Sequence, residues 1–445
     1  MQTAPPLGWI GIVRLGLVQA ALGSIVVLTT STLNRIMVVE LGLAAVIPGA
    51  LVGLHYGVQI ARPLFGHGSD RGGRRTPWIV GGVALLALAG VGAAVATALM
   101  AQNFALGLAL AIVDFILIGF GIGAAGTSLL ALLASSVAPE RRPAAATLVW
   151  LMMIFGIAVT AVVSGRFLDP FTMTRLVTVT AVAGLAALIL TLVAVLGVER
   201  RRPVEARPAP ARSASFRDSL ADAWADPQAR LFTIFVFVSM LGYSIQDLIL
   251  EPFAGLVFGM TPGQTTGLSG IQNGGVFAGM VLVGVAGSLL ARRIPAILRW
   301  FTIAGCVLSG AMLVGLAWAP AMADRWPLTA NVFALGFANG VFAVAAIASM
   351  MALAGAAGPS RVGLRMGLWG AAQGIAFGLG GFIGTVAVEL VQLLGAGHAV
   401  AYGSVFLAEA LIFLAAAIVA VRISPVRAAA PEADRTYGLG LQAAE

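Results

Sequence analysis

Ionisable side chains are rare within the long apolar runs of this 445-residue chain, and those that occur there could do chemistry. A charged group at membrane depth costs about 2.5–3.5 kcal/mol on insertion scales, so it usually has a function or a partner. The chain has no lysine, and arginine is nearly absent from the middles of the runs, so ion pairs there are mostly unavailable. The candidates are His55, Asp114, Asp247, Glu251, Glu389 and Glu409.

His55 lies near the middle of its apolar run, between Leu54 and Tyr56, with Gln59 one turn further along. A neutral imidazole is a good ligand for a metal ion. One such ion is the magnesium of a chlorophyll, which needs one axial donor in an apolar pocket. The alternative is a histidine that hydrogen-bonds to a neighbouring helix, and residue type alone favours that alternative.

Asp247 and Glu251 are four residues apart, so they share one face of a helix, just before Pro252. A proton-coupled carrier would use such acids for coupling. Alternatively they form a cap at the membrane surface, with Glu251 already in water. Asp114 faces the same choice, and the sequence leaves it open.

An aspartate run with a spacing of four follows a proline-rich segment, at Asp218, Asp222 and Asp226. Membrane prenyltransferases use aspartate-rich motifs of this spacing to hold magnesium and diphosphate, but they need two motifs that face one cavity. No second motif is present in the sequence. One face of a solvated, amphipathic helix on the membrane surface explains the run more simply.

The composition requires a membrane protein. Hydrophobic residues make up 60% of the chain and charged residues 10%, with a mean hydropathy of +0.99, whereas soluble chains are about 25% charged. A soluble enzyme, a disordered chain and a secreted disulfide scaffold are therefore excluded. The net charge of +8 would suit nucleic acid only on a soluble basic patch, so we expect membrane lipid and no nucleic acid as a partner.

The apolar runs predict an all-α membrane protein with twelve transmembrane helices. The seventh span is predicted to end near residue 250, with the short run at 252–260 as its cap. The predicted spans are 14–33, 44–65, 77–100, 104–133, 144–165, 175–198, 231–250, 267–290, 298–319, 328–354, 364–392 and 399–422.

Arginine placement predicts the orientation. With a cytoplasmic N-terminus, 22 arginines fall in inner segments and 4 in outer segments, among them Arg35. Such a bias indicates that both termini are cytoplasmic. The predicted division is an N-terminal six-helix half (1–198), a cytoplasmic linker with an amphipathic helix (199–230), a C-terminal six-helix half (231–422) and a cytoplasmic tail (423–445).

The connection between the second and third spans reads GHGSDRGGRR and fits the G-x-x-x-D-R-x-G-R-R pattern of the major facilitator superfamily, which the chain resembles over nearly its whole length. Glycines let two helix ends approach closely, and the aspartate can pair with a nearby arginine. The motif concerns the scaffold and its gating, so it predicts the fold and no substrate. Its residues are Gly66, Asp70, Arg71, Gly73, Arg74 and Arg75.

Several stretches further resemble the PucC family, a branch of that superfamily found with the photosynthesis genes of phototrophic bacteria. They occur in order through both halves. The stretches are 32–41 (TLNRIMVVEL), 139–143 (PERRP), 246–253 (QDLILEPF) and 367–374 (GLWGAAQG).

The resemblance implies a non-enzymatic assembly factor for light-harvesting antenna complexes that binds bacteriochlorophyll and delivers it to the α and β antenna polypeptides. It also implies the bacterial inner, photosynthetic membrane, with the reaction-centre core and bacteriochlorophyll synthase as further partners. His55 becomes the candidate ligand of the pigment magnesium. The other candidate pigment or partner residues are Asn34, Gln246, Asp247, Glu251, Trp369 and Gln373. The runner-up is a proton-coupled transporter of a small or tetrapyrrole-like solute.

Overall fold

A computed structural model describes residues 7–59, 74–138, 141–199, 224–290, 293–294, 296–322, 325–356 and 359–423. All regular elements within these residues are helices. They are α1 (Trp9–Val27), the π-helical turn η1 (Leu28–Thr32), α2 (Leu33–Arg35), a second π-helical turn η2 (Ile36–Glu40), α3 (Val46–Val58), α5 (Thr76–Met100), α6 (Phe104–Ser136), α7 (Arg142–Leu168), α8 (Met173–Val195), α10 (Pro227–Phe258), α11 (Pro262–Leu290), α12 (Ile297–Met322), α13 (Leu328–Ala356), α14 (Pro359–Leu393) and α15 (His398–Arg422).

The helices confirm the predicted membrane fold. Within the described residues, eleven helical segments are long and apolar enough to cross a membrane, and α3 is a shorter apolar helix at the place of the second predicted span. Hydrocarbon offers no hydrogen-bond partner for the backbone, so long apolar runs satisfy their own amide and carbonyl groups as helices. Each predicted span overlaps one helical segment, and residues 60–65 of the second predicted span lie outside the described residues.

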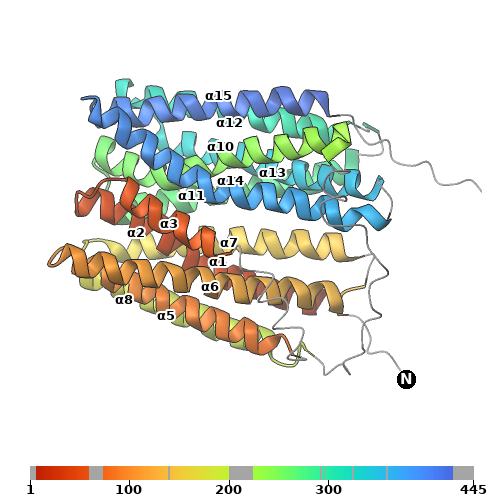
Figure 1. Cartoon of the computed structure of the whole chain (residues 1–445), viewed down its shortest axis with the longest axis horizontal. Helices are drawn as coiled ribbons and strands as arrows, with labels where there is room; N and C mark the ends of the chain where they lie inside the picture. The colour runs from red at the N-terminus through yellow and green to blue at the C-terminus, as the bar shows by residue number, and fades with distance from the viewer. Residues whose placement is uncertain are drawn as a thin grey trace, which may run out of the picture.

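The helices form two bundles that lie side by side (Figure 1). One contains α1 to α8, drawn from red to yellow, and the other contains α10 to α15, drawn from green to blue. Contacts between the bundles are made mainly by α3 with α14 and by α7 with α11, while the last turns of the first helix touch α10 and α11. We call these bundles the N-terminal and C-terminal halves.

The first helix is longer than predicted, and Arg35 is not in an exposed outer segment. The helix continues from Trp9 to Glu40 through the two π-helical turns. Arg35 is 2% exposed, enclosed by protein near the end of this helix. The bundle end that contains Arg35 is called the far end here; the opposite end, with Arg75, is the one predicted to face the cytoplasm.

The prediction that the seventh span ends near residue 250 is wrong, because α10 runs on through Pro252 to Phe258. A proline inside a helix lacks the amide that would bond to the carbonyl four residues earlier, here that of Leu248. Asn34 supplies the missing donor: its Nδ2 lies 2.6 Å from the Leu248 carbonyl oxygen. The helix can therefore continue past the proline, and it ends at Gly259, which has a positive φ of 65°.

Candidate functional site

The first helix carries three polar side chains that reach the C-terminal half. Asn34 donates to the Leu248 carbonyl, and the hydroxyls of Thr32 and Thr266 lie 3.2 Å apart. Arg35 donates to the carbonyl of Met260 at 2.7 Å. The predicted site residue Asn34 therefore lies between the halves and satisfies a backbone group.

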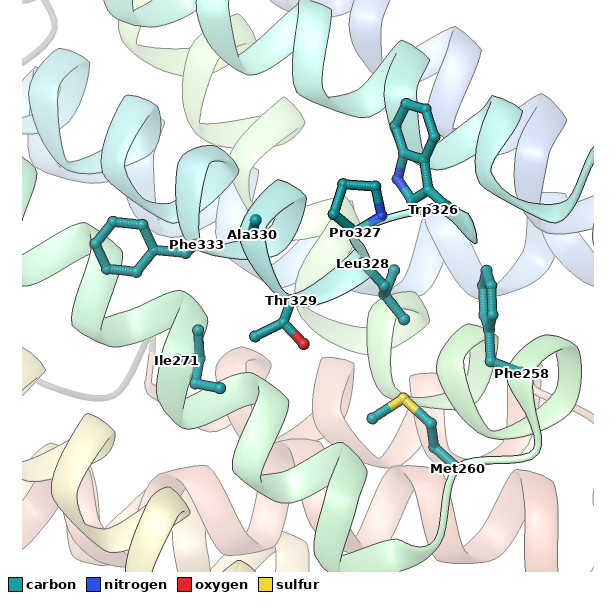
Figure 2. Close-up of a pocket in the computed structure, with 9 residues that line it drawn as sticks. All are labelled: Phe258, Met260, Ile271, Trp326, Pro327, Leu328, Thr329, Ala330 and Phe333. Carbon is teal, nitrogen blue, oxygen red and sulfur yellow. The ribbon is translucent and has the colours of Figure 1, made fainter. Parts of the chain in front are cut away.

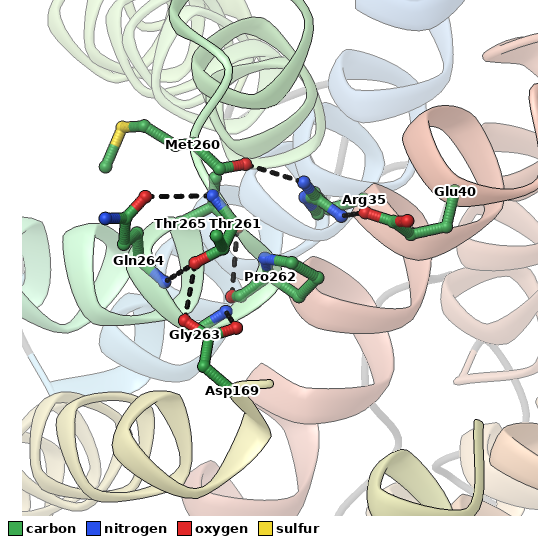
Figure 3. Close-up of polar contacts among 9 residues, drawn as sticks. All are labelled: Arg35, Glu40, Asp169, Met260, Thr261, Pro262, Gly263, Gln264 and Thr265. Atoms are coloured by element: carbon green, nitrogen blue, oxygen red, sulfur yellow. Dashed lines mark hydrogen bonds and ion pairs between the residues drawn. The ribbon is translucent and has the colours of Figure 1, made fainter. Parts of the chain in front are cut away.

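Arg35 belongs to a set of polar contacts that joins the halves at the far end (Figure 3). It pairs with Glu40 of its own helix as well as with Met260. Asp169, in the connection between α7 and α8, accepts hydrogen bonds from the Thr261 hydroxyl and the Gly263 amide. We call these six residues the far-end contact: Arg35, Glu40, Asp169, Met260, Thr261 and Gly263.

The polar side chains of α10 predicted to form a site are split between two environments. Gln246 and Glu251 are 0% and 1% exposed. Gln246 accepts from Gln272 of α11 at 3.3 Å, and Glu251 accepts from Ser269 of α11 at 2.5 Å. The alternative that Glu251 lies in water at a helix cap is therefore wrong, because α11 covers it.

Asp247 has a different environment from its neighbours. It is half-buried, and it lies one turn from Tyr243, close enough for their charges to interact if both were ionised. It lies similarly close to Glu409 of α15, which is 0% exposed. Neither carboxyl oxygen of Glu409 has a hydrogen-bond partner among the described residues.

His55 is enclosed within the protein on α3, and its backbone carbonyl lies against Gly119 of α6. Its exposed fraction is 1%, and its Nδ1 lies 2.9 Å from the carbonyl oxygen of Val52 in the preceding turn. If Nδ1 carries the proton and donates to that carbonyl, Nε2 carries the lone pair that a metal would need.

A continuous row of rings runs from His55 across the boundary between the halves. The His55 and Tyr56 ring centroids are 4.1 Å apart, those of Tyr56 and Phe377 of α14 are 6.2 Å apart, and those of Phe377 and Tyr243 of α10 are 5.7 Å apart. Tyr56, Phe377 and Tyr243 are half-buried. We call these four residues the aromatic row.

Sequence reasoning missed Tyr56, Tyr243 and Phe377 as site residues. Aromatic residues on apolar helices usually pack in cores, so no signal within a single run separated these three from the others. The available clue was that Tyr56 adjoins His55 and that Tyr243 precedes Asp247 by one turn.

The remaining two predicted residues lie on α14. Trp369 is 0% exposed, its ring centroid is 4.7 Å from that of Phe232, and its Nε1 lies 3.4 Å from the Ala229 carbonyl. Gln373, one turn further on, is half-buried beside Met240. Trp369 thus packs within the C-terminal half, away from the aromatic row.

Part of the predicted loop motif, Gly66, Asp70, Arg71 and Gly73, lies outside the described residues. Arg75 is described, and its guanidinium donates to the Ala131 carbonyl at 2.6 Å and to Ser135. It therefore joins the start of α5 to the end of α6, as a scaffold residue would.

Glu199, which sequence reasoning did not single out, accepts hydrogen bonds from the start of α5. Its carboxylate accepts from the amides of Arg75 and Thr76 and from the Thr76 hydroxyl. Partial burial acts to raise the pKa of Glu199, but these hydrogen bonds and the nearby charge of Arg74 outweigh it and hold the pKa below its usual value.

Two of the acids singled out in the sequence have structural roles. Asp226 caps the start of α10 by accepting from the amides of Gln228 and Ala229. Glu389 of α14 accepts from the Ala45 amide at the start of α3. Asp218, Asp222 and most of the predicted linker helix lie outside the described residues. Among the residues that the structure describes, no group of three or more His, Cys, Asp or Glu could hold a metal ion.

A groove of about 770 Å³ opens near the far end, beside the far-end contact (Figure 2). It lies between the end of α10, α11 and the start of α13, and its lining side chains are mostly apolar, with Thr329 contributing a hydroxyl. None of the predicted site residues lines it. The lining residues are Phe258, Met260, Ile271, Trp326, Pro327, Leu328, Thr329, Ala330 and Phe333.

Comparison with known sequences gives consistent matches over nearly the whole chain. The family model described as "PUCC protein" matches residues 32–428. The "Bacteriochlorophyll synthase 44.5 kDa chain" of Rhodobacter capsulatus is 53% identical, over 95% of this chain and 97% of that protein. "Protein PucC" of the same organism is 31% identical, over 92% of this chain and 91% of its own length.

Solved structures agree on the fold. The nucleoside transporter NupG matches with a TM-score of 0.67, covering 93% of this chain and 98% of that one. A bacterial homologue of the lysosomal transporter Spinster, in an inward-facing and unoccupied conformation, matches with a TM-score of 0.66 over 93% and 96% of the two chains. Both are 14% identical to this chain, so the likeness concerns the fold alone and confirms the predicted major facilitator architecture.

Proposed function

Because the chain belongs to the PucC protein family, a family of photosynthesis-related membrane proteins, we propose that it is an assembly factor for bacterial light-harvesting antenna complexes. In this role it binds bacteriochlorophyll between its two halves and delivers it to the α and β antenna polypeptides. It acts in the inner, photosynthetic membrane, with both termini in the cytoplasm.

The aromatic row is the observation that carries the proposal. A tetrapyrrole is a flat, largely apolar ring, and aromatic side chains bind such rings through offset stacking. The row lies where α3 of one half meets α14 and α10 of the other. A modest separation of the halves would therefore open a slot lined by Tyr56, Phe377 and Tyr243.

His55 fits the magnesium of the pigment by the chemistry of its ring. The hydrogen bond between Nδ1 and the Val52 carbonyl would hold the ring in one tautomer and orientation, as partners of metal-bound histidines commonly do. Magnesium in a chlorophyll supplies the coordination site. Because His55 is 1% exposed, pigment entry requires Tyr56 to move aside.

The half-buried Asp247, beside Tyr243, would face a polar substituent of the pigment or the solvent that enters with it. Asn34, Gln246 and Glu251 support this region by fixing α10 against α2 and α11. We propose the reaction-centre core and bacteriochlorophyll synthase as further partners, because a carrier of pigment must receive it and release it.

We propose that the chain is not itself an enzyme, although one relative is named a synthase chain. The sequence has only one aspartate run of the required spacing, and Asp226, its last member, is used to cap α10. A prenyltransferase needs two such motifs around one cavity. In vitro esterification of bacteriochlorophyllide by the purified protein would contradict this part of the proposal.

The test is the absorption spectrum of protein purified gently from a pigment-producing host. We expect bound bacteriochlorophyll in the unaltered chain and at least a tenfold lower content in His55→Ala. His398→Ala is the matched control, because His398 lies at the start of α15 beside Gln392 and should leave the pigment unchanged. Protein without pigment, together with normal antenna levels after gene deletion, would end the proposal.

A proton-coupled transporter is the second candidate, and two observations favour it. The fold is that of known transporters, and Asp247 is an only half-buried carboxyl within a membrane-spanning helix. Proton-coupled uptake of a small or tetrapyrrole-like solute into liposomes, lost in Asp247→Asn, would favour this candidate over the assembly factor.

A further inference from the structure

Asp114 is an acidic side chain on the outer surface of the N-terminal half. It lies on α6, against α5, and a Cβ added at Gly92 of α5 would overlap its carboxyl group. Asp114 is half-buried, and within the described part of the chain it has neither a hydrogen bond nor an ion pair. The carboxyl thus occupies the space that a side chain at residue 92 would fill, and we call this place the notch.

The surface around this notch is strongly apolar. On α5, Leu88 and Val95, one turn either side of Gly92, are 73% and 39% exposed. On α6, Leu110 and Val113 are 40% and 52% exposed. α5 and α6 pack side by side along their length and form one edge of the molecule (Figure 1). The side chains around the notch are therefore suited to contact lipid, and Asp114 is the acidic residue among them.

The notch lies at mid-depth. α6 begins at Phe104 near the far end, and at about 1.5 Å per residue Asp114 lies about 15 Å further along. A hydrocarbon core is about 30 Å thick. A carboxyl group near its middle, without a donor, is in the costliest position that a bilayer offers.

We propose that the notch at Asp114 docks a single membrane-spanning helix of a partner, which presents a hydrogen-bond donor at mid-depth. Gly92 makes room for the carboxyl against α5, and a donor on the partner helix satisfies that carboxyl where water and lipid do not. The flanking leucines and valines then pack against the apolar side chains of the partner. This inference does not depend on pigment binding, because Asp114 and the aromatic row lie on different surfaces.

Synthetic transmembrane peptides test the proposal directly. The purified full chain, labelled with a donor fluorophore, is reconstituted in phosphatidylcholine vesicles with acceptor-labelled Leu/Ala peptides that carry either Asn or Leu at the centre. We expect energy transfer to report an association of the Asn peptide that is about 5- to 30-fold stronger than that of the Leu peptide.

Two variants locate the contact. Asp114→Leu should abolish the preference for the Asn peptide, and Asp114→Asn should keep part of it, because the amide oxygen still accepts. A photocrosslinker at Leu110 should capture the Asn peptide, while one at Leu185, which is 59% exposed on α8, should not. Asp114 lies on the lipid-facing surface, so Asp114→Leu is not expected to prevent folding.

The proposal is overturned if the unaltered chain does not distinguish the two peptides, or if Asp114→Leu still does. It is also overturned if the labelled chain associates with itself through Asp114 in the absence of peptide, which would make the occupant a second copy. A loss of pigment binding in His55→Ala leaves these outcomes unchanged, so the two proposals can fail separately.

Discussion

Two regions at the boundary between the halves, the far-end contact and the aromatic row, are built from different interactions. The far-end contact consists of hydrogen bonds and an ion pair around Arg35 and Asp169. The aromatic row consists of ring contacts 4.1 to 6.2 Å between centroids. Hydrogen bonds are directional and fix one arrangement of the groups that they join, whereas ring contacts depend on packing and less strictly on orientation. The two regions should therefore respond differently to substitution.

Arg35→Ala should break the far-end contact with the largest effect. It removes the donor to the Met260 carbonyl and leaves Glu40 without its partner, so we expect the free energy of unfolding to fall by about 2–3 kcal/mol. Thermal unfolding in detergent measures it. Arg166→Ala, at an exposed position on α7, is the control and should change stability by less than about 0.5 kcal/mol. Equal effects of both would refute the role of Arg35.

Asn34→Ala should have the next largest effect and lower the free energy of unfolding by about 1–2 kcal/mol, because it leaves the Leu248 carbonyl without a donor. The cause can be isolated with Pro252→Ala, which restores a backbone amide that can bond to that carbonyl. In the Pro252→Ala background the cost of Asn34→Ala should shrink to a fraction of its value. An unchanged cost in the double variant would show that the proline is not the reason for Asn34.

Substitutions of Tyr243 in the aromatic row can distinguish the contribution of its ring from that of its hydroxyl. Tyr243→Phe should change stability by less than about 0.5 kcal/mol and keep the bound pigment, since the ring remains. Tyr243→Ala should lower the pigment content several-fold, by absorbance per protein. If the Phe variant loses as much pigment as the Ala variant, the hydroxyl and not the ring is the contact.

We expect Glu199 to have the smallest effect on stability, because all its contacts described above lie within the N-terminal half. Its pKa is below its ordinary value of 4.5, so the stabilisation it gives is complete above about pH 4.5 and is lost as the pH falls through the lower folded-state pKa. Thermal unfolding between pH 6 and about pH 3 should show this loss, and Glu199→Gln should lack that part of it. Pigment binding between the halves should not follow this titration.

Much of the fold could be predicted from the sequence, whereas the site could be predicted only in part. Apolar length alone located every helix. His55 and Asp247 were singled out as candidates because ionisable groups are conspicuous in apolar runs. Tyr56, Tyr243 and Phe377 were not, since their rings look like ordinary core residues until the halves are brought together. Arg35 was assigned to an outer segment between spans, and its burial could not be predicted because it depends on contacts with the C-terminal half, such as that with Met260.

The sequence by itself determined the helices, because hydrocarbon forces each long apolar segment to satisfy its own backbone. Only the tertiary structure decided that α10 continues through Pro252, since the donor that permits it is Asn34, far away in the chain. The same holds for the aromatic row: the sequence placed His55 and Tyr56 side by side in an apolar span, but the rings that continue the row from Tyr56, those of Phe377 and Tyr243, come from helices of the other half. Periodicity describes one helix at a time, whereas a site between two bundles is made by their packing.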